Sequence, residues 1–183
     1  MNTKVVTGPK TRMSYVNVFD PKSINGSAPK YSVSLIIPKD DKATLDKIKE
    51  AIKAAYKDGE VKLRDKNGKV PPLNTLKIPL RDGDLEKPDD KAYENAFFIN
   101  AKSDTAPGIV DAHLNRIMAK EDFYSGVYGR ASITFYAYNS NGNKGIACGL
   151  NNLQKLRDGE PLGGRTRPED DFSIEEDTDD FLN

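Results

Sequence analysis

Apolar and polar side chains alternate along several short segments of the chain, a pattern typical of β-strands with one buried face. Residues 12–19 and 31–37 show it most clearly and are rich in β-branched and aromatic residues. Because the segment between them is rich in turn-forming residues, we expect these two strands to pair as a hairpin with a long loop. Strands are also expected at 96–101 and in a second hairpin, formed by 128–138 and 145–150 around the turn NSNGNK.

One segment has helical periodicity instead. Asp40 or Asp41 can cap its beginning, and Gly59 can end it. Between these positions, four apolar side chains recur at the spacing of one helix face: Leu45, Ile48, Ile52 and Ala55. The sequence therefore predicts one long amphipathic helix with a charged outer face.

The other segments predict loops with little regular structure. Residues 60–95 contain many prolines, glycines and charges, and we expect a single short strand there, near 76–80. Short helical turns are expected at 111–117 and 151–156. Several strands, one helix and long loops indicate a mainly β protein, either a β-barrel or a small α+β domain.

Charge divides the chain into two parts. The chain has 28 basic and 28 acidic residues, and eight of the acids but none of the bases lie in residues 168–183. Residues 1–167 therefore carry a formal charge of +8 and are expected to form one domain. The acidic tail, 168–183, has too little apolar surface to fold and is expected to be disordered.

The composition also excludes several classes of protein. No apolar run approaches the ~20 residues of a membrane span, so no membrane association is expected. The single cysteine, Cys148, excludes an internal disulfide and suits a reducing cytoplasm. Since His113 is the only histidine, a zinc site of the usual His/Cys type is excluded, and we expect neither a metal nor another cofactor.

The strand at 128–138 carries the best candidate for function. Its odd positions are apolar and partly small, which fits the inside of a narrow barrel. Its even positions include three tyrosines and an arginine, which would share the opposite, accessible face: Tyr128, Arg130, Tyr136 and Tyr138. Aromatic rings beside a cation on an open sheet face can stack the bases of a single-stranded nucleic acid, at ~1–3 kcal/mol for each base.

Basic residues near both ends of the predicted domain could contact phosphates. They are Arg157, Arg165 and Arg167 before the tail, and Lys4, Lys10 and Arg12 near the beginning of the chain. Such contacts give affinity without sequence preference and with a strong dependence on salt. Scattered solvated lysines and arginines are the alternative interpretation of the same residues.

Two other functions are compatible with parts of the sequence. Five carboxylates within one loop, at 82–90, could hold magnesium in a nuclease, in which case Asp82 and Asp84 would be essential. However, the common nucleophile and phosphate-loop motifs are absent, and we expect no enzymatic activity. The other alternative is a β-rich assembly or scaffold protein that does not bind nucleic acid and whose tail only keeps it in solution.

Several segments together resemble a known family. The run DFYSGVYGRASITFYAYNSNGNKGIACGLNNLQKLRDGEPLGGRT, at 122–166, is similar to the C-terminal signature of single-stranded DNA-binding proteins encoded by phages and prophages of Gram-positive bacteria. The segments RMSYVNVFDP, YSVSLIIPK and FFINAKS fit the same family, so the resemblance covers most of residues 10–167. A wider resemblance is to the replication protein of T-odd coliphages, an OB-fold binder with an acidic tail.

The resemblance implies a five-stranded OB-fold barrel with one helix and long loop insertions. It implies non-sequence-specific binding of single-stranded DNA in phage replication or recombination. The tail would recruit replication or recombination proteins, such as a polymerase or a helicase-primase, and compete with DNA for the basic groove. The tail residues given this role are Asp170, Asp171, Phe172, Asp179, Asp180 and Phe181. A homodimer is compatible with the sequence, and the tail could then reach a neighbouring copy.

Overall fold

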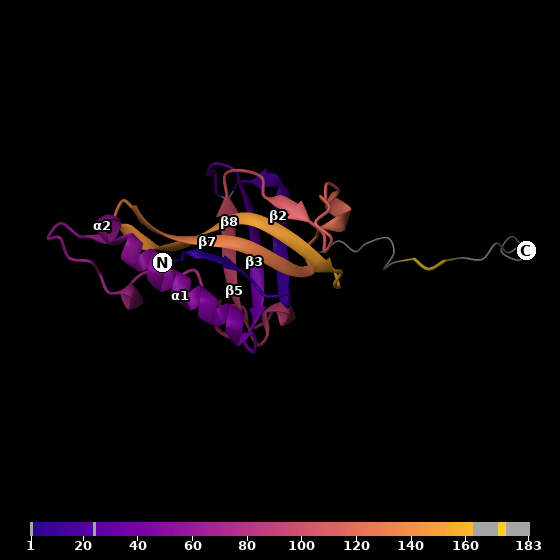
Figure 1. Cartoon of the computed structure of the whole chain (residues 1–183), viewed down its shortest axis with the longest axis horizontal. Coiled ribbons are helices and arrows are strands. Elements are labelled where there is room, and N and C mark those ends of the chain that lie inside the picture. Colours follow the sequence, from indigo (N-terminus) through magenta and orange to yellow (C-terminus); the bar gives the residue numbers. More distant parts are fainter. Residues whose placement is uncertain (1, 24, 163–171, 175–183) are drawn as a thin grey trace, which may run out of the picture.

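A computed structural model of the chain describes residues 2–23, 25–162 and 172–174 (Figure 1). The expected disorder of the acidic tail concerns residues that lie outside this description, except for 172–174. Eight strands form one sheet: β1 (Lys4–Val6), β2 (Thr11–Lys22), β3 (Lys30–Pro38), β4 (Arg81–Asp82), β5 (Ala96–Ser103), β6 (Gly108–Val110), β7 (Tyr128–Ser140) and β8 (Asn143–Arg157). The helices are α1 (Lys42–Asp58), α2 (Glu60–Leu63) and α3 (Gly83–Glu86), with 3-10 turns at η1 (Leu73–Thr75), η2 (Lys91–Tyr93) and η3 (Lys120–Asp122).

Five of the strands form a nearly closed ring. β2 pairs with β3, β3 with β5, β5 with β8, β8 with β7, and β7 again with β2. All these pairs are antiparallel except β5–β8, which is parallel and is registered through Lys102 and Gly149. The structure is therefore mainly β with one long helix, and its near-barrel ring of five strands agrees with the first of the two architectures that the sequence predicted.

The core fills the ring and continues beneath α1. Met13, Leu35 and Ile133, from three strands of the ring, have no exposed surface. α1 packs on β7 and β1 (Figure 1), and its apolar stripe is buried as expected. The Asp41 side chain accepts the backbone N–H of Thr44 to cap the helix. In the part of the chain that the structure describes, no helix is both long and apolar enough to cross a membrane.

Three of the local expectations are wrong. The short strand near 76–80 lies instead at 81–82, where it pairs with β5. Residues 111–117 form no helical turn, because the Asp111 carboxylate accepts the backbone N–H groups of His113 and Asn115 and favours a tight turn. Residues 151–156 continue β8, since their backbone pairs with β7 on one side and β6 on the other, and this tertiary pairing outweighs helix propensity.

Candidate nucleic-acid interface

A basic groove crosses the outer face of the ring, over β2, β3, β5 and the β7–β8 hairpin; we call it the sheet groove. It consists of three adjoining hollows of about 520, 940 and 530 Å³, and Lys102 lines all three. Lys102 and Asn100 point outwards from β5 because they alternate with the buried Ile99 and Ala101. Six cations line the sheet groove: Lys22, Lys30, Lys77, Arg81, Lys87 and Lys102.

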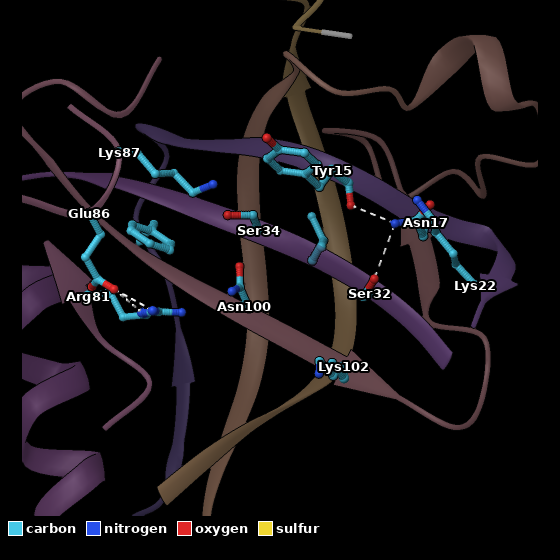
Figure 2. Close-up of a pocket in the computed structure, with 12 residues that line it drawn as sticks. Tyr15, Asn17, Lys22, Ser32, Ser34, Arg81, Glu86, Lys87, Asn100 and Lys102 are labelled. Atoms are coloured by element: carbon cyan, nitrogen blue, oxygen red, sulfur yellow. Dashed lines mark hydrogen bonds and ion pairs between the residues drawn. The ribbon is translucent and has the colours of Figure 1, made fainter. Parts of the chain in front are cut away.

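Tyr15 provides an open aromatic face at one end of the sheet groove (Figure 2). The pairing of β2 with β3 shifts register between Ser14 and Asn17, and Tyr15 lies in this bulge with φ of 47°. A side chain in this left-handed region is strained by about 1–3 kcal/mol. The bulge turns the ring outwards, where 59% of the residue is exposed. Strict alternation from the buried Met13 would have placed Tyr15 in the core, so no periodic signal in the sequence reveals it.

Lys87 lies among aromatic rings beside Tyr15. Its ammonium is 5.1 Å from the centroid of Tyr15, 5.0 Å from that of Tyr93 and 5.7 Å from that of Phe98. The Tyr93 hydroxyl donates to Ser34 Oγ at 3.0 Å, which fixes the buried ring in place. Arg81 lies over Phe98 at 5.6 Å and forms an ion pair with Glu86. These cations are therefore held over rings at the edge of the sheet groove.

The alternation predicted for β7 is confirmed by burial. The odd positions lie in the core: Gly129, Ala131, Ile133, Phe135 and Ala137. The even positions face outwards, and Tyr136 and Tyr138 line the sheet groove near Lys30 and Lys77. Tyr136 is 49% exposed, so its ring is open to a ligand at the opposite end of the groove from Tyr15.

Tyr128 lies far along β7 from Tyr136 and in different surroundings. The Arg157 guanidinium is 4.0 Å from its ring centroid and that of Arg12 is 5.0 Å away. Arg12 also donates to the backbone oxygens of Gly126 and Glu160, at 3.1 and 2.7 Å. Tyr128 thus holds two guanidinium groups, and the predicted set of tyrosines is divided between the two ends of β7.

The other predicted phosphate-binding residues lie outside the sheet groove. Arg130 donates to the Thr7 carbonyl at 3.4 Å, Lys4 is exposed on β1 opposite Thr134, and Lys10 is exposed in the turn before β2. Arg165 and Arg167 lie outside the described residues, as do the tail residues Asp170, Asp171, Asp179, Asp180 and Phe181. Phe172 is described and is exposed.

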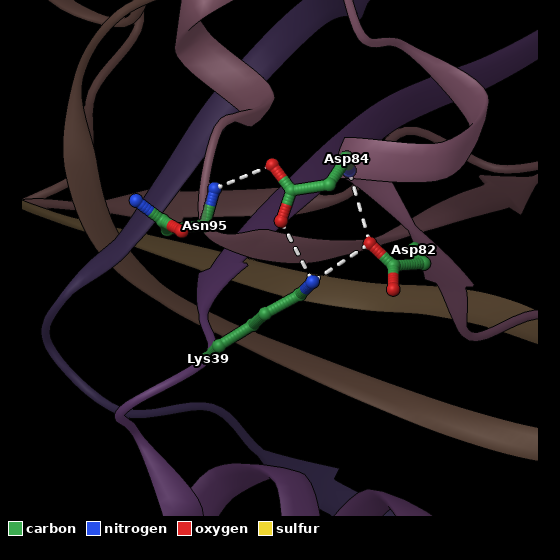
Figure 3. Close-up of polar contacts among 4 residues, drawn as sticks. All are labelled: Lys39, Asp82, Asp84 and Asn95. Atoms are coloured by element: carbon green, nitrogen blue, oxygen red, sulfur yellow. Dashed lines mark hydrogen bonds and ion pairs between the residues drawn. The ribbon is translucent and has the colours of Figure 1, made fainter.

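Asp82 and Asp84, the carboxylates that would be essential in a nuclease site, form ion pairs with a lysine (Figure 3). Lys39 Nζ is 2.9 Å from Asp82 Oδ1 and 2.7 Å from Asp84 Oδ2. Asp84 also accepts the backbone N–H of Asn95 at 3.0 Å. The hydrogen bond from Lys39, with that from Asn95, lowers the pKa of Asp84, and the same contacts to Asp84 and Asp82 raise the pKa of Lys39. Across the described ranges, no three His, Cys, Asp or Glu side chains gather where they could hold a metal ion.

This network predicts a pH-dependent contribution to stability. Because the pKa of Asp84 is lower in the folded chain than in the unfolded one, its contribution is present above the unfolded value, about 3.9, and is lost as the pH falls through the folded value. We expect Asp84→Asn to lower the thermal midpoint at about pH 7 and to lower it less at an acidic pH, where the carboxyl becomes protonated. Asp46→Asn, on the exposed face of α1, is the control; an equal loss at both pH values would contradict the prediction.

A family model and a known relative both match most of the chain. The family model described as "Enterobacter phage Enc34, ssDNA-binding protein" matches residues 3–182. Putative protein p50 of Acyrthosiphon pisum secondary endosymbiont phage 1 is 30% identical over 157 residues, which cover 84% of this chain and 83% of p50.

Solved structures show the same fold. The single-stranded DNA-binding protein of bacteriophage Enc34, solved in complex with single-stranded DNA, is 25% identical and has a TM-score of 0.75, over 88% of this chain and 90% of that chain. The single-stranded DNA-binding protein gp2.5 of bacteriophage T7 has a TM-score of 0.60, over 91% of this chain and 98% of its own. Because gp2.5 is 14% identical, that likeness concerns the fold alone.

Proposed function

Because the chain belongs to the family of the single-stranded DNA-binding protein of Enterobacter phage Enc34, we propose that it binds single-stranded DNA through the sheet groove. The family consists of binding proteins, not enzymes. The observation that carries the proposal is the placement of Tyr15 and Tyr136, two exposed rings at the two ends of a groove lined by six cations. Rings on which bases stack, with cations beside them for the phosphates, provide affinity without sequence preference.

Each part of the sheet groove has a role in this proposal. Tyr15 and Tyr136 stack bases, and Tyr138, which lines the same hollow as Tyr136, is proposed to stack a further base. Lys102, at the centre of the groove, contacts the backbone between the two rings. Asn100 and Ser32 can donate hydrogen bonds to bases or sugars that pass over them.

Basic residues on and beside β7 extend this path in our proposal. Where the DNA strand leaves the sheet groove, its phosphates are bound by Arg12 and Arg157, which are held against Tyr128, and by Arg130, Lys4 and Lys10. Tyr128 then positions two guanidinium groups and does not itself stack a base. Arg165 and Arg167 are proposed to add to the same electrostatic attraction.

For the acidic tail we propose two roles. Its acids compete with DNA for the basic surface, and Phe172 and Phe181, flanked by Asp170, Asp171, Asp179 and Asp180, bind replication or recombination proteins such as a polymerase or a helicase-primase. We also propose that the protein acts in the cytoplasm of the infected bacterium, where a homodimer would let the tail of one copy reach the other.

The proposal is tested by fluorescence anisotropy of a labelled single strand of about 30 nucleotides, titrated at several salt concentrations. If about five phosphates are neutralised, the logarithm of the binding constant should fall against the logarithm of the salt concentration with a slope near −3.5, from ~0.7 for each phosphate. Absence of binding even at low salt would overturn the proposal and favour the assembly-protein alternative.

The same titration on a chain ending at Arg167 tests the tail. If the tail competes with DNA, the shortened chain binds more tightly, and the difference narrows as salt is added because both effects are electrostatic. Equal binding by the two chains would leave the DNA-binding proposal intact and would contradict competition by the tail.

A further inference from the structure

One wall of the sheet groove is formed by residues 81–95, which we call the groove wall. This segment begins with β4, continues through α3 and η2, and ends where β5 begins. Arg81 and Lys87 extend from it into the groove (Figure 2). β4 anchors its beginning, because Arg81 and Asp82 pair with Phe98 and Phe97. The positions of two of the six groove cations therefore depend on how this segment is held.

Lys39 joins the two ends of the groove wall. Its ammonium bridges Asp82 and Asp84 at the beginning, as described above, and its backbone N–H donates to the Asn95 carbonyl at the end, at 2.9 Å. Asp84 completes the connection by accepting from the Asn95 N–H (Figure 3). Lys39 itself lies just after β3 and is not among the residues that line the sheet groove.

The ammonium is the cationic partner that Asp82 and Asp84 share. Two carboxylates lie within 3 Å of it, and without it they would repel each other at short range. A Cβ added at Gly83, between them, would lie 2.3 Å from the Tyr93 carbonyl oxygen and 2.8 Å from that of Ala96, so the two ends of the wall lie close together. We expect removal of the charge to loosen the groove wall beyond β4, which carries Lys87 and also Glu86, the ion-pair partner of Arg81.

We propose that Lys39 is a positioning residue for DNA binding, which acts by holding the groove wall so that Arg81 and Lys87 face the bound strand. This inference rests on the proposed function of the sheet groove. Lys39 lies outside the groove, so its contact with Asp82 and Asp84 can be broken without changing any side chain that lines the groove.

The first test compares Lys39→Met with Lys39→Arg and with Lys53→Met, a control on the exposed face of α1. We expect Lys39→Met to weaken binding of a 30-nucleotide single strand about five- to tenfold, and Lys39→Arg to restore it to within about twofold. Lys53→Met should change binding little. Unchanged binding by Lys39→Met, in a chain whose circular dichroism shows it to be folded, would overturn the proposal.

The second test separates positioning from a direct contact between Lys39 and DNA. Asp84→Asn keeps Lys39 charged and frees it from one carboxylate, so a direct contact would be strengthened and binding would tighten. A positioning role predicts the opposite, because the groove wall is loosened. Weaker binding by Asp84→Asn supports the proposal, and tighter or unchanged binding contradicts it; this variant also serves if Lys39→Met folds poorly.

The third test distinguishes failure of this inference from failure of the proposed function. Lys87→Met alone should weaken binding if the sheet groove holds DNA, and a chain in which it has no effect would count against the groove itself. If Lys87→Met weakens binding, the effects of Lys39→Met and Lys87→Met should be less than additive in the double variant. Fully additive effects would leave the groove proposal standing and overturn the positioning role of Lys39.

Discussion

Replacement of Tyr15 and Tyr136 together by alanine is expected to weaken single-stranded DNA binding by roughly one and a half to four orders of magnitude. Stacking of one base on an aromatic ring contributes ~1–3 kcal/mol, so two rings contribute ~2–6 kcal/mol, and every ~1.4 kcal/mol is a factor of ten in affinity. The two rings are exposed and lie on different strands, so their removal should leave the fold intact. Alanine retains the Cβ, so the left-handed backbone at residue 15 is equally strained in this variant.

The measurement is the anisotropy titration at one fixed salt concentration, followed by its repetition over a range of salt. Because no charge is removed, the affinity should fall while the salt slope remains that of the unsubstituted chain. Tyr15→Phe with Tyr136→Phe, which retains both rings, is the matched control and should bind within about twofold. Binding by the double alanine variant at the original affinity would show that neither ring stacks a base.

Gly129→Ala is expected to lower the free energy of unfolding strongly, although it adds only one methyl group. A Cβ at this position would lie 1.8 Å from the Gln154 carbonyl oxygen of the neighbouring strand, and a backbone atom within β7–β8 cannot move aside alone. Forced overpacking typically costs ~1–3 kcal/mol and sometimes more, and a clash with backbone should lie at or above the top of that range. For a chain of this size, we expect the thermal midpoint to fall by roughly 10 °C.

Gly149→Ala provides the matched control on the other strand of the same pair. There the new Cβ would be 3.5 Å from the Thr134 carbonyl oxygen, an ordinary contact, and the thermal midpoint should change little. Thermal unfolding followed by circular dichroism compares the two variants directly. Equal midpoints for the two alanine variants would mean that β7 and β8 can separate locally without loss of the ring.

The sequence predicted those elements whose pattern is local. The helix from 42 to 58 has a capping aspartate, an apolar stripe and a terminal glycine, all of which lie within one segment. The two hairpins have alternating strands and turn residues between them. Where pairing with distant strands decides the conformation, as for the second half of β8, local propensity gave the wrong element.

The proposed binding surface was predictable only in part, for the same physical reason. The accessible face of β7 follows from alternation, and with it Tyr136 and Tyr138. The six cations of the sheet groove come from segments between residues 22 and 102, and only the ring of strands brings them together. A strand that alternates buried and exposed positions, such as Ile99–Asn100–Ala101–Lys102, carries a signal that could have identified Lys102.

The backbone of Tyr15 has a consequence for how this protein can evolve. Glycine or asparagine would occupy the left-handed conformation at lower cost, so the residue that presents the ring is a poor choice for the fold alone. Stability and the proposed binding role are thus opposed at a single position. Selection for heat resistance alone would favour replacement of this tyrosine, so its retention among related chains would support the binding role that we propose for its ring.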